Sequence, residues 1–355
     1  MIVTLPHMGH YATAFKALIE DCGFEMLIPP PSTRKTMELG SAHSPEFTCL
    51  PFKINLGNYI EALEQGAEVL LQAGRAGECR YGLYCEVQEQ ILKDLGYKFK
   101  MVNLFGGGKQ FNFLSAVKSI NGDIPNLRIL KASAHTLFRI YFIEEMEQRT
   151  RELRPFEIKP GSADRLLARG VKKLRQTSSL SEGRRLKREI RREFDAIETD
   201  RTRECLRIGI VGELYVVMEP RANLDMERKL GEMGVAVTRP MCLSGLLKHA
   251  VMPFLRRRMI EKGKDFIEGE LGAHAADSIG HTVEFSREGY DGVIHLYPFT
   301  CMPEVSARGI LTNVSRKLDI PVLSLALSEQ TGEAGLDTRL ESFVDMIRRG
   351  KKKRS

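Results

Sequence analysis

Short apolar runs alternate with amphipathic stretches along the first third of the chain. The apolar runs are bounded by glycine or proline, as strands commonly are, and span 1–7, 24–31, 67–74 and 98–108. The stretches with apolar residues at helical spacing end at glycine, a common helix stop, and span 11–23, 54–66 and 83–96. The segment 44–53 shows no periodicity and is expected to be a loop. This order predicts a parallel sheet with helices on both faces.

A second alternating region follows a highly charged segment. Residues 135–203 show helical patterning and no strand-like run. Beyond them, strands are expected at 206–216, 235–240, 290–300 and 320–327, and helices at 223–234, 244–262, 304–319 and 338–350. We therefore predict an α/β protein with two doubly wound parallel-sheet domains, 1–134 and 204–355, joined by a charged helical connector, 135–203.

The composition is that of an ordinary globular protein, with 43% hydrophobic and 28% charged residues among 355. No uninterrupted apolar run reaches the roughly 18–20 residues that a membrane span needs. The opening segment MIVTLPHMGHY lacks the basic and apolar regions of a secretory signal, so we expect a cytoplasmic protein. Its seven cysteines are then expected to be buried thiols, metal ligands or redox groups rather than structural disulfides.

The net charge of +7 is unevenly distributed. Residues 149–203 hold 17 Lys and Arg against 9 Asp and Glu, and the tail RRGKKKRS adds six positive charges. Such segments can meet nucleic acid or an acidic partner. However, the only aromatic residues within 149–203 are Phe156 and Phe194, which offers little for base stacking. The sequence therefore favours a solvated helical connector over a nucleic-acid-binding surface.

A short cysteine loop occurs once in each predicted domain. FTCLP spans 47–51 and FTCMP spans 299–303, each with proline two residues after the cysteine. Proline fixes φ and carries no N–H, which suits a non-helical turn that holds a thiolate. Amide N–H groups near such a sulfur would tune an iron–sulfur cluster. The FTCMP loop directly follows a predicted strand, at the sheet edge where open α/β folds bind ligands.

Cys79 lies in a third loop, within GECRYGLYCE at 77–86. Two alternatives to an iron–sulfur site remain for the cysteines of these three loops. They could be small buried hydrophobic residues, or they could bind zinc. The zinc interpretation is weak because five residues separate Cys79 from Cys85, too many for a short pair, and because His7 and His10 lack a nearby thiol.

The remaining chemically interesting residues have ordinary explanations as well. We expect Cys22 and Cys205 to be packing residues, whereas Cys242 and Cys85 could approach a site. Further candidates follow the ends of predicted strands. His7 and His10 could transfer a proton or face a phosphate. Glu329, Thr331 and Glu333 could relay protons or cap a helix, and GGGK at 106–109 could bind an anion.

Several longer segments are more specific together than alone. They are TCLPFKINLGNYIEALEQGAEVLL, GECRYGLY, IVGELYVVMEPRANLDMERKLGEMGV, YPFTCMPE and SEQTGEAGLDTRLESFVDM. These segments resemble the 2-hydroxyacyl-CoA dehydratase component superfamily, in particular its D-component-like, activator-associated branch. The similarity covers most of the chain outside the charged middle.

The resemblance implies flavodoxin-like domains with an iron–sulfur cluster, most simply [4Fe–4S], in the cleft between them. The cluster-binding cysteines of the family correspond to Cys49, Cys79 and Cys301, which would leave one iron open to a substrate. A double-cubane cluster would also need Cys85 or Cys242. The implied activity is low-potential electron transfer, or reduction or dehydration of a small substrate, with a separate ATP-hydrolysing activase as electron donor. A homodimer is the common assembly of such relatives.

The sequence also departs from what an activase or a CoA-binding enzyme needs. FGGGKQF at 105–111 is not a P-loop, because Gln110 stands where the motif requires Ser or Thr after the lysine. No segment matches a CoA-binding site. Two alternatives to an enzyme therefore stay open, a non-catalytic electron carrier and a protein that docks an acidic partner through 149–203.

Overall fold

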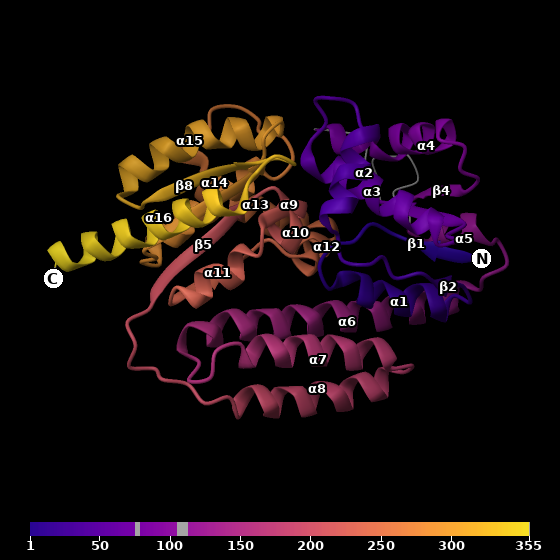
Figure 1. Cartoon of the computed structure of the whole chain (residues 1–355), viewed down its shortest axis with the longest axis horizontal. Coiled ribbons are helices and arrows are strands. Elements are labelled where there is room, and N and C mark those ends of the chain that lie inside the picture. The colour runs from indigo at the N-terminus through magenta and orange to yellow at the C-terminus, as the bar shows by residue number, and fades with distance from the viewer. Residues whose placement is uncertain (75–78, 105–112, 355) are drawn as a thin grey trace. The chain divides into compact units, whose positions relative to one another are not determined.

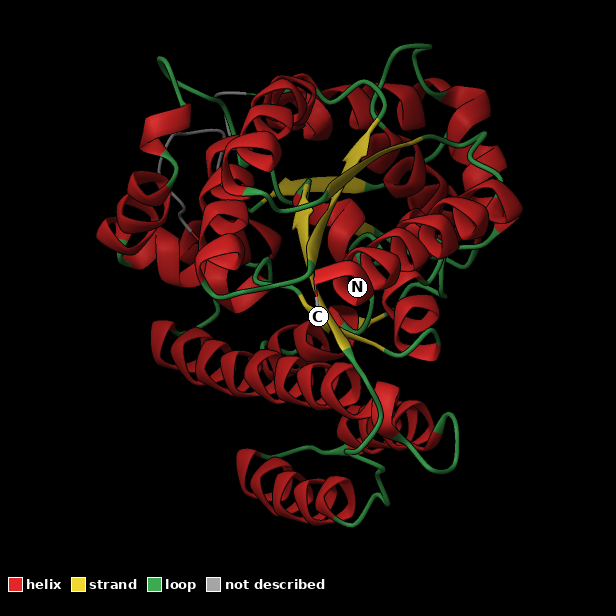
Figure 2. Cartoon of the chain, turned by 90° about the vertical axis from the view of Figure 1, so that its left-hand side faces the viewer, coloured by secondary structure: helices red, strands yellow, loops and turns green. Residues whose placement is uncertain are grey.

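The computed structural model describes residues 1–74, 79–104 and 113–354. It divides into two compact units. Unit 1 comprises Met1–Ile143 and Val171–Arg185, and unit 2 comprises Glu144–Gly170 and Leu186–Ser355. Each unit contains a four-stranded parallel sheet flanked by helices (Figures 1 and 2). The chain is therefore an α/β protein, as the alternation of strands and helices predicts.

Unit 1 has a short sheet in which all neighbouring strands are parallel. Its strands are β1 (Ile2–Thr4), β2 (Glu25–Met26), β3 (Val69–Gln72) and β4 (Lys100–Asn103), in the order β2-β1-β3-β4. All four residues of β3 are buried. This explains why β3 reads as a continuous run, since a strand covered on both faces has no solvent-facing side.

Helices cover both faces of this sheet. They are α1 (Tyr11–Asp21), α2 (Arg34–His43), α3 (Leu50–Glu64), α4 (Tyr84–Asp94) and α5 (Phe113–Ile120), with the 3-10 turn η1 (Arg80–Leu83) before α4. One core cluster joins α1 and α5 to Val69 and Leu71, and another joins α3 and α4 to Leu70. Successive strand side chains point to opposite faces, so these clusters lie on opposite sides of β3.

Two glycines let α2 and α3 pack backbone against backbone. A Cβ atom at Gly40 would lie 1.7 Å from the carbonyl oxygen of Lys53, and one at Gly57 would lie 1.9 Å from that of Thr36. Only glycine fits at such a distance. This packing fixes α3, whose first residue directly follows Cys49.

Unit 2 has the same strand order with longer strands. They are β5 (Leu206–Gly212), β6 (Val235–Thr238), β7 (Gly292–Pro298) and β8 (Val322–Leu327), all parallel, in the order β6-β5-β7-β8. The helices are α9 (Leu214–Met218), α10 (Pro220–Asn223), α11 (Met226–Glu232), α12 (Leu243–Val251), α13 (Pro253–Lys262), α14 (Ala275–Arg287), α15 (Met302–Leu318) and α16 (Glu333–Arg354), with the 3-10 turn η3 (Lys264–Phe266).

The sheet of unit 2 is also covered on both faces. Phe285 of α14 packs with Val293 of β7 in one core cluster. Gly292 directly precedes Val293 on β7. Phe343 and Ile347 of α16 fill the space that a side chain at Gly292 would occupy. Adjacent strand residues face opposite ways, so α14 and α16 lie on opposite faces of this sheet.

The charged middle of the chain is helical, as its patterning predicts. It contains α6 (Asn126–Leu153), η2 (Arg154–Phe156), α7 (Ser162–Gln176) and α8 (Leu180–Asp195). The division between the units passes through all three helices, so each contributes residues to both units. The helical region also begins earlier than residue 135, at Asn126.

Buried ion pairs hold part of this helical region within unit 2. The side chain of Arg239 is 4% exposed and lies 2.7 Å from a carboxylate oxygen of Glu147 and 2.6 Å from one of Glu227. Arg151 lies 3.2 Å from Glu227. Burial alone would raise the pKa of Glu227, but Arg239 and Arg151 outweigh burial and hold that pKa at about 2.

Several sequence-based boundaries differ from the structure, among them the strand expected at 206–216, which ends at Gly212 and is followed by α9. The expected loop 44–53 is shorter, because α3 begins at Leu50 with Pro51 in its first turn, where the fixed φ of proline suits a helix. The expected helix 244–262 is two helices, because Pro253 cannot donate a backbone hydrogen bond and starts α13. The expected strand 24–31 contains only the two residues of β2.

The longest helix in the described part of the chain is α6, with 28 residues, and charged side chains occur along its length. Among the described residues, no helix is both long enough and apolar enough to span a bilayer.

Candidate functional site

Four of the seven cysteines occupy the same local position, the residue just before a helix. Cys49, Cys79, Cys242 and Cys301 precede α3, η1, α12 and α15, each with an extended backbone. All four are partly exposed. A thiol at such a position lies outside the helical hydrogen-bond ladder and near the N–H groups of the first turn.

The strand order shows how these cysteines correspond between the units. Cys79 follows β3 and Cys301 follows β7, the third strand of each sheet in chain order. Cys49 and Cys242 each lie between the second and third strands. The repeat of FTCLP and FTCMP thus shares a sequence and a helix-start geometry, but Cys301 corresponds in topology to Cys79.

Cys79 and Cys301 lie beyond the ends of strands where ligands commonly bind. In both sheets the second and third strands lie on opposite sides of the first strand. This makes the carboxyl ends of the first and third strands a topological switch point, the usual ligand position in open α/β sheets. The expectation that the FTCMP loop directly follows a strand is confirmed, since β7 ends at Pro298.

Two contacts join the Cys49 and Cys79 segments within unit 1. The Sγ atom of Cys49 lies 2.6 Å from the hydroxyl oxygen of Tyr84. Nη1 of Arg80 donates a hydrogen bond to the carbonyl oxygen of Phe47 at 2.6 Å. Arg80 is the neighbour of Cys79, and Phe47 is two residues before Cys49. The structure therefore brings together the segments of two of the three cysteines that the resemblance singles out.

The residues that make this junction are packed in place. Tyr84 is 3% exposed, and its ring meets those of Phe52 and Tyr81 edge to face, each at 5.0 Å between centroids. Nε2 of Gln88, one turn further along α4, donates to the carbonyl oxygen of Phe52 at 3.2 Å. The starts of α3 and α4 are thus held together by rings and by a buried amide. Sequence patterning did not single out Tyr84 or Arg80; their nearness to Cys79 was the available signal.

In unit 2, a buried carboxylate fixes the first turn of α15, the helix that follows Cys301. Glu304, in the first turn of α15, is 1% exposed. One of its carboxylate oxygens lies 2.9 Å from Nε2 of His295 and accepts a hydrogen bond from the hydroxyl of Ser278 at 3.1 Å. His295 is on β7 and Ser278 is on α14, so this network fixes the start of α15 against the sheet.

Glu213 is a further residue at this edge that sequence patterning missed. It directly follows β5, and its carboxylate accepts hydrogen bonds from the N–H groups of Tyr215 and Val216 at 3.2 and 2.9 Å. Burial raises the pKa of Glu213, although these two N–H groups oppose the rise. The switch point of unit 2 therefore carries a partly buried carboxyl group; its signal in the sequence was an acidic residue within the apolar strand expected at 206–216, which ends at Gly212.

The other cysteines are in environments that disfavour a thiolate. Burial, followed by the charges of Glu86 and Glu89, raises the pKa of Cys85 to about 12. Burial also raises the pKa of Cys205 and Cys22. These shifts agree with packing roles for Cys22 and Cys205 and argue against Cys85 as a ligand.

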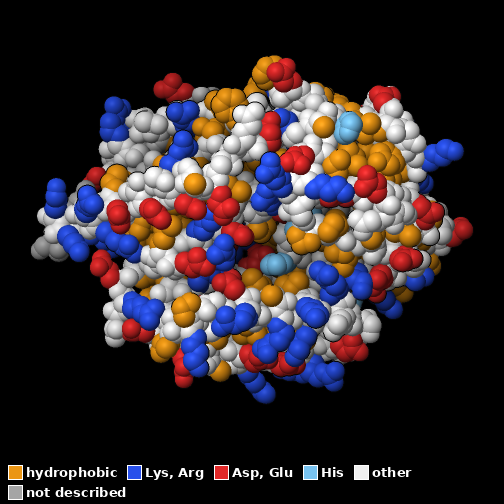
Figure 3. All heavy atoms as spheres, in the orientation of Figure 1, with side chains coloured by type: hydrophobic (Ala, Val, Ile, Leu, Met, Phe, Trp, Pro, Cys, Tyr) orange, Lys and Arg blue, Asp and Glu red, His pale blue; other side chains and the backbone are white. Residues whose placement is uncertain are grey.

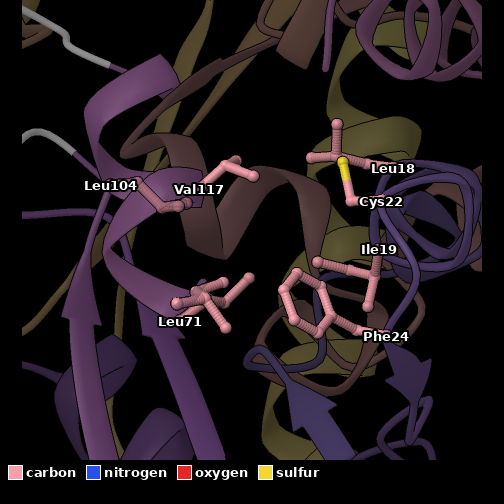
Figure 4. Close-up of a pocket in the computed structure, with 8 residues that line it drawn as sticks. Leu18, Ile19, Cys22, Phe24, Leu71, Leu104 and Val117 are labelled. Carbon is pink, nitrogen blue, oxygen red and sulfur yellow. The ribbon is translucent and has the colours of Figure 1, made fainter. Parts of the chain in front are cut away.

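Cys22 lines a small apolar cavity in unit 1 (Figure 4). The cavity has a volume of about 10 Å³ and also contacts Leu18, Phe24, Leu71 and Val117. A water molecule needs polar partners as well as space, so we expect this cavity to stay dry. Cys22 therefore lies in the hydrophobic core.

The sequence-based histidine and carboxylate candidates make structural contacts. The backbone N–H of His7 donates to the side-chain oxygen of Asn58 at 3.1 Å, and His10 precedes α1. The hydroxyl of Thr331 accepts the N–H of Ser328 at 2.8 Å, which caps the turn before α16. Glu333 lies 2.8 Å from Nζ of Lys229. The candidate Glu329 lies in that turn, and GGGK at 106–109 lies outside the described residues.

The cysteines before the helices fit the donor chemistry of an iron–sulfur cluster. Clusters bind thiolates, and Cys49 and Cys79 are partly exposed, close to helix N–H groups and joined through their flanking residues. Within the described residues of the chain, no group of three or more His, Cys, Asp or Glu side chains is arranged to hold a metal ion.

The exposed positive charge gathers on the middle helices. Figure 3 shows Lys and Arg side chains over the region of α7 and α8, interspersed with Asp and Glu. Arg169, Lys172, Arg184 and Arg188 on these two helices are exposed. Part of this charge is neutralised locally. Arg169 is paired with Glu193, and Lys187 lies 2.7 Å from Glu145. Exposed pairs of this kind contribute little to stability, so the helices present a largely solvated charged face.

Searches of the sequence against protein-family models and against curated proteins find no match to the chain.

Proposed function

We propose that this chain is an iron–sulfur protein related to the 2-hydroxyacyl-CoA dehydratase components, with Cys49, Cys79 and Cys301 as thiolate ligands of a [4Fe–4S] cluster. The observation that carries the proposal is the junction of the Cys49 and Cys79 segments through Tyr84 and Arg80. Cys301 is the counterpart of Cys79 in the second sheet. The strand orders match the first four strands of the flavodoxin-like order 2-1-3-4-5, which supports two flavodoxin-like doubly wound domains as the scaffold.

A bound cluster with three protein thiolates would supply low-potential one-electron chemistry with one iron open to a small substrate. The chain's own residues would place the sulfur atoms and shape the surroundings. Phe47 and Phe299, in the two repeated loops, are 70% and 68% exposed and present apolar surface beside Cys49 and Cys301. The activity would be reduction or dehydration of a small substrate, with electrons from a separate ATP-hydrolysing protein.

Serine substitutions test the ligand assignment. Cys49→Ser, Cys79→Ser and Cys301→Ser should each lose most of the bound iron after anaerobic purification, because a hydroxyl is a poor substitute for a thiolate on iron. Cys205→Ser is the matched control, since burial keeps that thiol protonated, and it should retain wild-type iron. Full iron content in the three ligand variants would contradict the assignment.

A specific observation favours a second candidate function, a non-catalytic electron carrier. Cys242 shares the helix-start position and extended backbone of the three proposed ligands. A fourth thiolate would close the coordination of the cluster and leave no iron open to substrate. Cys242→Ser should keep its iron if the site has three ligands, and should lose iron and gain an exchangeable iron position if it has four.

A further inference from the structure

Tyr84 directly contacts the sulfur atom of Cys49, one of the proposed ligands. Its hydroxyl oxygen is 2.6 Å from Sγ of Cys49, and the residue is 3% exposed. A tyrosine hydroxyl buried to this extent normally has a hydrogen-bond partner. A thiolate carries no proton, so in the pair with a thiolate the hydroxyl must donate and the sulfur must accept.

The surrounding packing gives this hydroxyl a fixed direction. The ring of Tyr84 lies edge to face with Phe52 at an interplanar angle of 86° and with Tyr81 at 64°. Phe52 is three residues after Cys49 on α3, so the same helix start positions the sulfur and the ring that supports its partner. The next residue on α4, Cys85, is buried in the core of unit 1.

We propose that Tyr84 is a positioning residue that donates a hydrogen bond to the sulfur of Cys49 and thereby raises the reduction potential of the cluster. The inference rests on the proposed function. Reduction adds negative charge that spreads onto the ligand sulfur atoms, and a donor directed at sulfur stabilises this charge. Hydrogen bonds to the sulfur atoms are one of the terms that set the potential of iron–sulfur clusters, and outer contacts of this kind tune metal sites generally.

Tyr84→Phe isolates the hydroxyl, because it keeps the ring and its packing against Phe52. The expected result is a reduction potential more negative than that of the wild type, with iron content per chain unchanged, measured by a redox titration followed by EPR. Tyr59→Phe is the matched control. It lies on α3 in the same core cluster, but its hydroxyl donates to the carbonyl oxygen of Leu71 at 2.8 Å and lies 2.6 Å from Oε1 of Gln72. It should lower stability and leave the potential unchanged.

Each other outcome overturns the inference. An unchanged potential in Tyr84→Phe means that the hydroxyl does not tune the cluster, and an equal shift in Tyr59→Phe means that general loosening of unit 1 causes the change. Loss of iron from a folded Tyr84→Phe protein assigns Tyr84 a structural role only. Wild-type protein that binds no iron defeats the proposed function and this inference together, whereas normal iron with an unchanged potential defeats this inference alone.

Discussion

The two units have the same strand order, and the cysteine of each repeated FTC loop starts a helix, but the packing around these two helix starts differs. In unit 1 a side chain touches the thiol itself, since Tyr84 lies against Cys49. In unit 2, His295 and Ser278 hold the buried Glu304 in the first turn of α15, which follows Cys301. The comparison teaches that the same short sequence can start a helix in both units while the side chains that pack around the helix start differ.

The units also differ in how their helices pack. In unit 1, α2 and α3 meet through Gly40 and Gly57, with no room for a side chain. In unit 2, the buried Arg239, which directly follows β6, is paired with Glu147 of α6 and Glu227 of α11. Unit 2 should therefore respond more strongly to the loss of a charged partner, and unit 1 to the addition of volume.

The largest expected effect comes from removing the buried partner of Glu304. His295→Ala leaves a buried carboxyl group with one contact fewer and creates a cavity, and should destabilise unit 2 by about 3–5 kcal/mol. Urea unfolding followed by circular dichroism measures this change. His43→Ala is the control, because His43 is exposed at the end of α2 and its loss should matter little. A loss below about 1 kcal/mol for His295→Ala would show that the network does not hold α15.

The second largest expected effect is a difference between the two units in their stability at acid pH. The folded pKa of Glu227, about 2, lies below its ordinary value of 4.5. The lowered pKa of Glu227 therefore contributes roughly 3 kcal/mol to the stability of unit 2. This stabilisation is fully present above about pH 4.5 and is lost as the pH falls towards 2. Hydrogen exchange at pH 6 and pH 3 should show unit 2 losing protection first. In Glu227→Gln the loss of protection on acidification should be smaller; an unchanged acid response in that variant would contradict the ion-pair account.

A pair of glycine substitutions gives the smallest effects and tests the packing difference. Gly57→Ala places a Cβ 1.9 Å from the carbonyl oxygen of Thr36 and should destabilise unit 1 by about 1–3 kcal/mol. Gly309 lies in the middle of α15, where an added Cβ meets nothing within 4 Å. Gly309→Ala should therefore stabilise unit 2 by up to about 1 kcal/mol through helix propensity. Thermal unfolding measures whether each substitution lowers or raises stability. Equal changes in stability for the two variants would contradict the proposed difference in packing between the units.

The sequence predicted the sheets well because their strands are apolar runs closed by glycine or proline. It gave no signal for α14, because the buried side of that helix carries Asp277, Ser278 and Thr282, and polar residues hide an amphipathic pattern. It missed α2 for a related reason, since its contact with α3 depends on glycine. Such helices are specified by tertiary contacts that periodicity does not record.

The site was only partly predictable for a similar reason. The repeated FTC loops identified Cys49 and Cys301 as local motifs, and the structure adds that both cysteines start helices. The contact between Cys49 and Tyr84 joins residues far apart in sequence and follows from the packing of α3 on α4. The correspondence of Cys301 with Cys79 follows from strand order, which no local motif contains.

The most direct test of the account is the iron and acid-labile sulfide content of the wild-type chain purified without oxygen, with an EPR spectrum after reduction. The account predicts about four of each per chain and a reduced-cluster signal; about eight or nine would indicate a double-cubane cluster. Protein that holds neither iron nor sulfide, even after reconstitution, would contradict the account, and Cys49, Cys79 and Cys301 would then be ordinary thiols at the starts of helices.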